Sequence, residues 1–215
     1  MRDILVLGDS HSPIFNHELF KEKFPDVFFK VVTVVGATAS GLENPNSLTQ
    51  AYPIFRKAID ESAAQQVIIM LGEVDTGFVI WYRAQKYQES VASMMDQAID
   101  SYSRFLLELT VRFDVLCIST PLPTIQDDND WGDIANARRE VTASLLERTA
   151  LTLKFNRTMQ AFCTQNGIRY IMLDDSSLGE NGIVKADLLN SDRSNHHYDP
   201  EQYFHLLADG LTGVI

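Results

Sequence analysis

The sequence reads Ile-Leu-Val-Leu-Gly-Asp-Ser at residues 4–10. Four apolar residues that end in Gly-Asp-Ser are typical of a buried strand followed by a tight turn, which presents a hydroxyl group at Ser10. Open α/β sheets place their sites at the carboxyl ends of strands. Ser12 and Pro13 suit the N-cap and first turn of a helix, whose N-terminal N–H groups stabilise negative charge. Ser10 is therefore a candidate nucleophile for a reaction with an oxyanion intermediate, and an ordinary βα turn is the alternative interpretation.

Length and composition limit the classes of function. The chain has 215 residues, which suits one domain with a sizeable core. Its net charge of −11 opposes binding to a nucleic acid or an anionic membrane, so we expect neither as a partner. The sequence shows no signal peptide and no membrane span, which favours a cytoplasmic location. The oligomeric state stays open.

Cysteines and acidic runs give no sign of a metal site or a cofactor. Cys117 and Cys163 lie among apolar residues, so we expect two buried free thiols. The histidines and carboxylates lack the spacing of a strong metal motif, and we predict no metal and no cofactor. Residues 127–133 include four aspartates, but the glutamate that ends a calcium-binding EF-hand loop does not follow at the required spacing. We interpret this run as a solvated loop, and Asp174 and Asp175 in the same way.

Apolar periodicity divides the chain into alternating strands and helices. Strands are expected at residues 4–7, 27–35, 66–71, 115–119 and 168–173. Helices are expected at residues 13–24, 47–64, 87–113, 135–166 and 200–211. Five alternations without a linker or repeat predict a single α/β domain over residues 1–215, a three-layer α/β/α sandwich with a five-stranded parallel sheet. We expect the flavodoxin-like strand order 2-1-3-4-5, which brings all strand ends to one edge.

Two adjacent histidines, His196 and His197, precede the last predicted helix, and Asp192 lies shortly before them. A histidine and a nearby acid are the residue types that supply a general base and the group that orients it. The loop that carries them leaves from the same edge of the sheet as Ser10. A structural or exposed role for the histidines is the alternative.

Taken in order, these motifs resemble the four blocks of the SGNH/GDSL hydrolases. The blocks are Gly-Asp-Ser at residues 8–10, a glycine after the second strand, Gly-Glu-Val-Asp at residues 72–75, and residues 192–197. In that family the serine is the nucleophile, and its N–H, the glycine and an asparagine of the third block form the oxyanion hole. The last block supplies an aspartate and the base. The resemblance spans nearly the whole chain.

The resemblance implies a role for each matching residue. Ser10 is the nucleophile. His197 is the base, because it stands shortly before the proline that begins the last helix, and His196 is the reserve. Gly36 is the oxyanion glycine because it directly follows the second strand, with Gly41 in reserve.

Two positions depart from the family's pattern. Val74 stands in place of the oxyanion asparagine and has no side-chain donor. Either another group, such as Arg83 or His11, supplies the donor, or the reaction is slower or different. Asp192 lies five residues before His197 rather than three. A bulge in the chain would be needed for Asp192 to orient the base.

Further polar and aromatic residues follow the third strand. Glu73 and Asp75 bring two carboxylates to the expected site, where they hold Arg83 or the histidines, bind substrate hydroxyls or form a structural ion pair. Trp81 and Tyr82 form either a platform that stacks on a sugar or a lid over the core.

The resemblance implies a serine esterase that acts on a small-molecule or carbohydrate ester, with a small O-acyl group such as acetyl. Two alternatives remain open. One is acyl transfer to a glycan hydroxyl by the same residues, and the other is a non-catalytic glycan-binding member of the fold.

Overall fold

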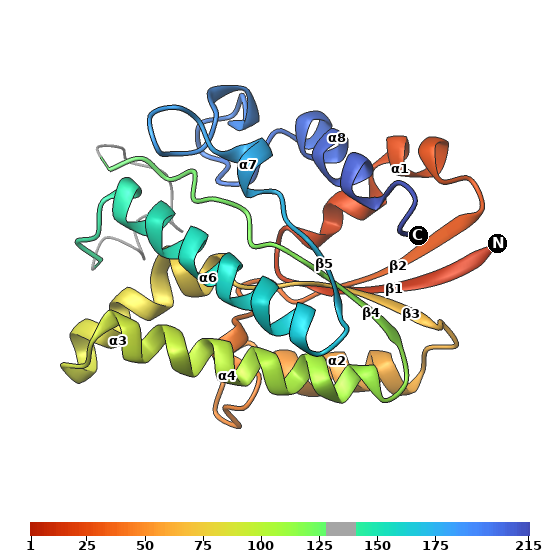
Figure 1. Ribbon diagram of the computed structural model, residues 1–215, viewed down its shortest axis with the longest axis horizontal. Coiled ribbons are helices and arrows are strands. Elements are labelled where there is room, and N and C mark those ends of the chain that lie inside the picture. The colour runs from red at the N-terminus through yellow and green to blue at the C-terminus, as the bar shows by residue number, and fades with distance from the viewer. Residues whose placement is uncertain (128–140) are drawn as a thin grey trace.

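The chain folds around one five-stranded parallel sheet, as the computed structural model of residues 1–127 and 141–215 shows (Figure 1). The strands are β1 (Arg2–Gly8), β2 (Val27–Thr33), β3 (Gln66–Met70), β4 (Asp114–Ile118) and β5 (Arg169–Ile171). Their order, β2-β1-β3-β4-β5, confirms the predicted topology, and every neighbouring pair is parallel. The carboxyl ends of the strands therefore meet at one edge, which lies away from the two chain termini (Figure 1).

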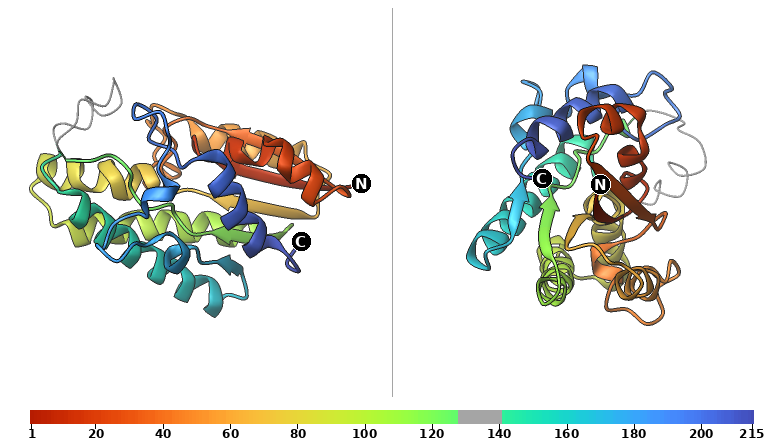
Figure 2. Two further views of the ribbon diagram at one scale, coloured as in Figure 1. Left: turned by 90° about the horizontal axis from the view of Figure 1, so that it is seen from above. Right: turned by 90° about the vertical axis from the view of Figure 1, so that its right-hand side faces the viewer.

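Helices cover both faces of the sheet and confirm the three-layer architecture (Figures 1 and 2). One face carries α2 (Ala51–Asp60), α3 (Ile80–Tyr87), α4 (Val91–Thr110) and α6 (Leu145–Gln165). The other face carries α1 (Glu18–Lys23), α7 (Asp174–Ser177) and α8 (Pro200–Leu211). Within the described part of the chain, no helix is long and apolar enough to cross a membrane.

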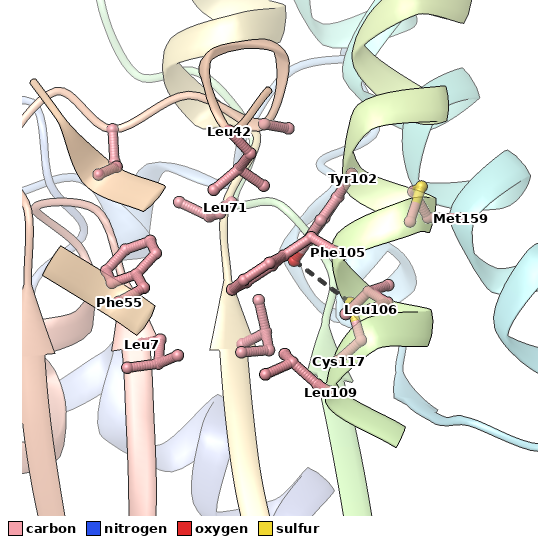
Figure 3. Close-up of a cluster of buried hydrophobic side chains, with 14 of the residues drawn as sticks. Leu7, Leu42, Phe55, Leu71, Tyr102, Phe105, Leu106, Leu109, Cys117 and Met159 are labelled. Atoms are coloured by element: carbon pink, nitrogen blue, oxygen red, sulfur yellow. Dashed lines mark hydrogen bonds between the residues drawn. The ribbon is translucent and has the colours of Figure 1, made fainter. Parts of the chain in front are cut away.

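The interior strand β1, which lies between β2 and β3, is apolar on both faces because both faces are covered. Leu5 and Leu7 point into the larger core beneath α2 and α4, part of which is drawn in Figure 3, and Ile4 and Val6 point into the smaller core beneath α1 and α8. This alternation is the normal consequence of strand geometry. Because β1 packs into both cores, the Gly-Asp-Ser turn at its end has a fixed position at the carboxyl edge of the sheet.

Both cysteines are free and buried, as predicted. Cys117 on β4 lies 3.4 Å from the hydroxyl of Tyr102 on α4 (Figure 3). Burial raises the pKa of the Cys117 thiol, and the neighbouring thiol of Cys163 raises it further. Cys117 is therefore a protonated core residue, and Cys163 is a second buried thiol of the same core.

The helix predicted at residues 13–24 is two shorter elements. The 3₁₀ helix η1 (Ser12–Asn16) is followed by His17, whose backbone is extended with a ψ of 138°. The helix α1 begins directly after His17. The helix predicted at 47–64 is likewise shorter, because α2 begins at Ala51 after the left-handed residue Gln50. Short turns, including the 3₁₀ helix η2 (Ala39–Gly41), occupy the preceding segment.

The long helix predicted at residues 87–113 is also divided. Gln88, with a φ of 56°, ends α3, and the Ser90 side chain caps α4 by accepting the N–H of Ser93 at 3.0 Å. Residues that we expected to form a loop before this helix are helical: the π-helix η3 (Asp75–Val79) runs directly into α3. The break and the cap, rather than the apolar periodicity, decide where these helices begin and end.

The helix predicted at residues 135–166 begins later, at α6, where Ser144 and Glu147 form a capping box. Residues 135–140 of that prediction lie outside the described residues. Gly167, with a φ of 67°, follows the end of α6 as expected.

Two aspartates that we interpreted as solvated are engaged in the structure. Asp127 accepts hydrogen bonds from Nη2 of Arg148 at 2.9 Å and from the N–H of Leu145 at 2.6 Å, so it holds the start of α6. Asp174 is buried and accepts a hydrogen bond from Nδ2 of Asn156 at 2.7 Å. Asp175 is exposed, and the remaining aspartates of the acidic run lie outside the described residues.

Asn156 joins α6 to the ends of β4 and β5. Its Oδ1 accepts the N–H of Thr120 at 2.9 Å, and its Nδ2 donates to the Thr120 carbonyl at 2.9 Å as well as to Asp174. Burial raises the pKa of Asp174 from 3.8 to about 6, although the hydrogen bond from Asn156 opposes the shift. This fully buried amide therefore satisfies three polar groups at the functional edge of the sheet.

Replacing Asn156 with alanine should lower the free energy of unfolding by about 2–4 kcal/mol, because it leaves a buried carboxyl group and a backbone amide without partners. Urea denaturation followed by circular dichroism measures this change. Thr158→Ala, at an exposed position of the same helix, is the matched control and should cost less than about 0.5 kcal/mol. Equal midpoints for the two variants would contradict the role of Asn156.

Candidate active site

The turn that carries Ser10 is held by close backbone contacts. A side chain at Gly8 would place its Cβ 2.8 Å from the Met70 carbonyl oxygen and 2.8 Å from Cβ of Ser12, so this position requires glycine. The N–H of Asp9 donates to the same Met70 oxygen at 3.2 Å. These contacts bring the end of β1 tightly against β3 and leave Ser10 half-buried at the edge.

Ser12 does not cap a helix, contrary to our expectation. Its hydroxyl donates to the Asp9 carbonyl at 2.8 Å and lies 2.7 Å from the hydroxyl of Thr33 at the end of β2. The N-cap residue of η1 is His11, without a side-chain cap. A short 3₁₀ helix thus follows the nucleophile candidate where we predicted an α-helix.

Asp9 orients the residue that follows Ser10. Its buried Oδ1 accepts the N–H of His11 at 2.9 Å and lies 3.0 Å from Nδ1 of the same histidine. The His11 ring centroid lies 4.6 Å from that of His197. The ring of His11 thus lies beside the ring of His197, the candidate base.

The last loop brings both predicted histidines to this position. The ring centroids of His196 and His197 are 4.1 Å apart, and His196 lies 6.1 Å from His11. Oδ1 of Asn195 lies 2.8 Å from Nδ1 of His197 and accepts its backbone N–H at 3.1 Å. Because an amide oxygen accepts, Nδ1 of His197 carries the proton and Nε2 has the lone pair that a general base needs.

Asp192 has a different partner from the one expected. Its Oδ1 accepts the N–H of Ser194 at 2.9 Å and the Ser194 hydroxyl at 2.7 Å, and these bonds lower the pKa of the Asp192 carboxyl group. The side chain is exposed. Asn195, a residue that our sequence analysis missed, takes the place at Nδ1 of His197 that we expected for Asp192. An asparagine two residues before a histidine gave no recognisable signal.

Tyr198 fixes this loop to the rest of the edge. Its hydroxyl accepts the N–H of Leu122, in the segment after β4, at 2.7 Å. The His196 carbonyl accepts the hydroxyl of Thr124 from the same segment at 2.6 Å. Asp199 then caps α8, in which Pro200 is the first residue. The histidines are therefore held by the segment that follows β4 as well as by α8.

The two glycines considered for the oxyanion hole differ in what their N–H groups do. The Gly41 N–H donates to the Thr38 carbonyl at 3.1 Å, and a Cβ at Gly41 would lie 2.5 Å from Oγ1 of Thr38, so a tight turn explains this glycine. The N–H groups of Ser10 and Gly36 have no acceptor among residues 1–127 and 141–215. Gly36 has a φ of 73°. Between the two, Gly36 has the N–H that is available to a ligand.

Asp75 connects the loops that follow β2 and β3. Its fully buried carboxylate accepts the N–H of Ala39 at 2.7 Å and that of Ser40 at 3.1 Å. Burial raises the pKa of Asp75 from 3.8 to about 6; the hydrogen bonds from Ser40 and Ala39 and the positive charge of Arg83 lower it. Asp75 therefore holds the backbone of the Gly36 loop, and Arg83 acts on Asp75.

The other residues after β3 occupy different environments. Glu73 is buried, and its charge contributes to raising the pKa of Tyr198, which burial raises most. Val74 is half-buried. The Trp81 indole N–H donates to the Thr76 carbonyl at 2.8 Å, and its ring packs against the larger core. This packing agrees with the interpretation of Trp81 as a lid over the core rather than as a platform for a sugar.

A cavity of about 360 Å³ lies beside the Ser10 turn, and Ser10, His11, Asn195 and His197 all line it. Within the described ranges, no group of three or more His, Cys, Asp or Glu side chains is arranged to hold a metal ion. The site thus combines a hydroxyl group, an oriented imidazole and two available backbone N–H groups, which is the equipment of acyl transfer.

No known family model and no curated protein matches the sequence. Solved structures do match. A GDSL-like lipase from Bacteroides thetaiotaomicron superposes with a TM-score of 0.64 at 15% identity, over 99% of this chain and 87% of the other. An acetyl xylan esterase superposes with a TM-score of 0.61 at 14% sequence identity, over 99% of each chain. A carbohydrate acetylesterase from Sinorhizobium meliloti superposes with a TM-score of 0.60 at 14% sequence identity, over the full length of both chains.

The chain has the GDSL-hydrolase fold. The expected resemblance is confirmed at this level, with the strand order and the two helical layers. At such low identities the roles of individual residues rest on the local geometry described above. Val74, at the position where the resemblance leads us to expect an asparagine, is half-buried and has no polar side chain.

The buried Asp75 carboxyl should make the stability of the GDSL fold depend on pH. Since its pKa is raised to about 6, its contribution is fully present below about pH 4 and is lost as the pH rises through 6. The expected loss is on the order of 3 kcal/mol, at about 1.4 kcal/mol per pKa unit. Urea denaturation between pH 4 and 7 should show a flatter profile for Asp75→Asn than for the wild type. Asp175→Asn, at an exposed position, is the control, and parallel profiles for all three proteins would refute this account.

Proposed function

We propose that the protein is a serine esterase in which Ser10 is the nucleophile and His197 is the general base. The observation that carries this proposal is that Ser10 and His197 line the same cavity, with the tautomer of His197 set by Oδ1 of Asn195. The sequence placed these residues almost two hundred positions apart. Their convergence at the carboxyl edge of a parallel sheet is where this architecture positions its sites.

The reaction follows from the positions of these groups. Nε2 of His197 takes the proton of Ser10 as Oγ attacks the ester carbonyl, and the N–H groups of Ser10 and Gly36 stabilise the oxyanion. The imidazolium then protonates the departing alcohol, which leaves an acyl group on Ser10. Water, deprotonated by the same imidazole, hydrolyses the acyl-enzyme and restores the free serine.

The neutral Asn195 orients the base but contributes no negative charge to stabilise the imidazolium. The Asp9 carboxylate contributes that charge, because it holds His11, whose ring contacts His197. We therefore assign Asp9 and His11 a supporting role on the side of the base, and we replace Asp192 by Asn195 as the orienting residue.

The proposed substrate is a small O-acyl ester, such as an acetyl ester of a carbohydrate. Two structures with this fold carry the names acetyl xylan esterase and carbohydrate acetylesterase, which supports a similar substrate here. The net charge of −11 favours a neutral rather than an anionic partner. Product analysis in the presence of methyl glucoside separates hydrolysis from acyl transfer, the alternative that uses the same residues.

Ser10→Ala should reduce the hydrolysis of p-nitrophenyl acetate by a factor on the order of 10³ or more, because the nucleophile is removed. A fluorophosphonate probe should label the wild type and fail to label this variant. Ser176→Ala, at an exposed serine of α7, is the control and should keep both the activity and the labelling. Equal rates for wild type and Ser10→Ala would overturn the proposal, and failure to label the wild type would favour a non-catalytic binding protein.

Asn195→Asp should strengthen the base. A carboxylate beside Nδ1 stabilises the imidazolium and raises the pKa of His197, so the acid limb of the pH–rate profile should move up by about one pH unit. The plateau rate should rise as well. Asp192→Asn is the matched control and should leave the profile in place, since the Asp192 carboxylate is engaged by Ser194. A profile that responds to Asp192 and not to Asn195 would restore Asp192 as the orienting residue.

A further inference from the structure

The cavity beside Ser10 lies on one side of the site only. Every residue that lines it belongs to residues 10–17 or to residues 190–203, that is, to the Ser10 turn with η1 or to the last loop with the start of α8. The lining includes no residue from the loops after β2 and β3, where Gly36 and Asp75 lie. The cavity is therefore on the side of the base, away from the Gly36 loop.

This placement determines which part of an ester enters the cavity. In the proposed mechanism His197 protonates the departing oxygen, so the alcohol part of the ester must lie next to His197. The carbonyl oxygen points instead towards the N–H groups of Ser10 and Gly36. The cavity is thus adjacent to the departing alcohol.

Two residues that line the cavity, His17 and Tyr203, each carry a buried polar atom without a hydrogen-bond partner in the described part of the chain. Among the described residues, neither Nδ1 of His17 nor the hydroxyl of Tyr203 has a hydrogen-bond partner. Only 2% of Tyr203 is exposed, and burial keeps the pKa of its hydroxyl well above the usual value, a shift to which the Asp9 charge adds. Buried polar groups without partners are rare and unfavourable, so hydroxyl groups of a ligand are a natural complement to these two atoms.

The remaining lining suits a polyol ring. Pro13, Ile14 and Pro200 provide apolar surfaces, and the side-chain amides of Asn16 and Asn190 provide further polar groups. At about 30 Å³ for each water-sized group, a cavity of about 360 Å³ holds about a dozen such groups. A hexose has about that number of non-hydrogen atoms, whereas an acetyl group would leave most of the space empty.

We propose that this cavity binds the alcohol part of the ester, a hydroxylated ring of monosaccharide size, with His17 and Tyr203 as hydrogen-bond partners of its hydroxyl groups. The assignment rests on the proposed esterase function. It adds two residues that determine specificity and lie outside the four motifs from which that function was inferred.

Two acetate esters that differ only in the alcohol test the assignment. Tyr203→Phe should lower kcat/KM for methyl 6-O-acetyl-glucoside, relative to ethyl acetate, by about three- to tenfold, mainly through KM. The Tyr203 hydroxyl has no hydrogen-bond partner among residues 1–127 and 141–215, so thermal unfolding should show no loss of stability in this variant. Tyr102→Phe, at a buried tyrosine of the other core, is the matched control and should leave the ratio of the two substrates unchanged.

Filling the cavity gives a second, independent variant. Ile14→Trp should lower the same ratio at least tenfold, because the indole occupies the space of the ring. If both variants leave the ratio unchanged, the assignment is overturned. If they instead impair hydrolysis of p-nitrophenyl octanoate and spare the sugar ester, the cavity binds the acyl chain and the assignment is wrong.

A binding measurement separates failure of this assignment from failure of the proposed function. If Ser10→Ala abolishes hydrolysis of both esters while the ratio responds to neither variant, only the cavity assignment fails. If the wild type hydrolyses neither ester, saturation-transfer NMR with methyl glucoside still tests the cavity. Signals that appear with wild type and disappear with Ile14→Trp would support it, and their absence with wild type would overturn it.

Discussion

The close approach of backbone at Gly8 is the constraint on which the site depends. Because this residue has no side chain, the Met70 carbonyl and Ser12 come within a distance that any Cβ would prevent. The chain therefore turns at the point where β1 ends, and the buried Asp9 carboxylate can hold His11. Ser10 is positioned by its neighbours on both sides, without a hydrogen bond from its own N–H to any described residue.

Buried polar side chains connect the remaining loops at this edge. Asp75 joins the loops after β2 and β3, Asn156 joins the ends of β4 and β5, and Tyr198 joins the last loop to the segment after β4. Each takes up backbone N–H groups that would otherwise be buried without partners. Burial raises the pKa of the carboxyl groups of Asp75 and Asp174 and of the hydroxyl of Tyr198. The loops at this edge are therefore held by side chains whose ionised forms are disfavoured by burial.

The sequence predicts the fold because the interior strands β1, β3 and β4 are buried on both faces and their sequences are nearly continuous apolar runs. It predicts helix ends less well, since these depend on single residues such as the left-handed Gln88 and the capping pair of Ser144 and Glu147. The capping box is visible in the sequence, but the apolar periodicity masked it. The role of Asn195 was beyond prediction, because it depends on how the last loop turns between Leu189 and Tyr198, which form a β-bridge with each other.

In the proposed reaction, the two departures from the sequence pattern of the GDSL hydrolases concern two opposite charges. A valine at position 74 removes a donor to the oxyanion, and a neutral amide at Asn195 removes negative charge beside the imidazolium. In the proposed reaction, the oxyanion and the imidazolium of His197 would thus each lack one partner that the pattern of the GDSL hydrolases provides. On the base side, the Asp9–His11 pair against His197 places a buried carboxylate one ring away, which offsets part of the loss. On the oxyanion side, stabilisation falls on the N–H groups of Ser10 and Gly36, and their geometry depends on Asp75, which holds the Gly36 loop in place.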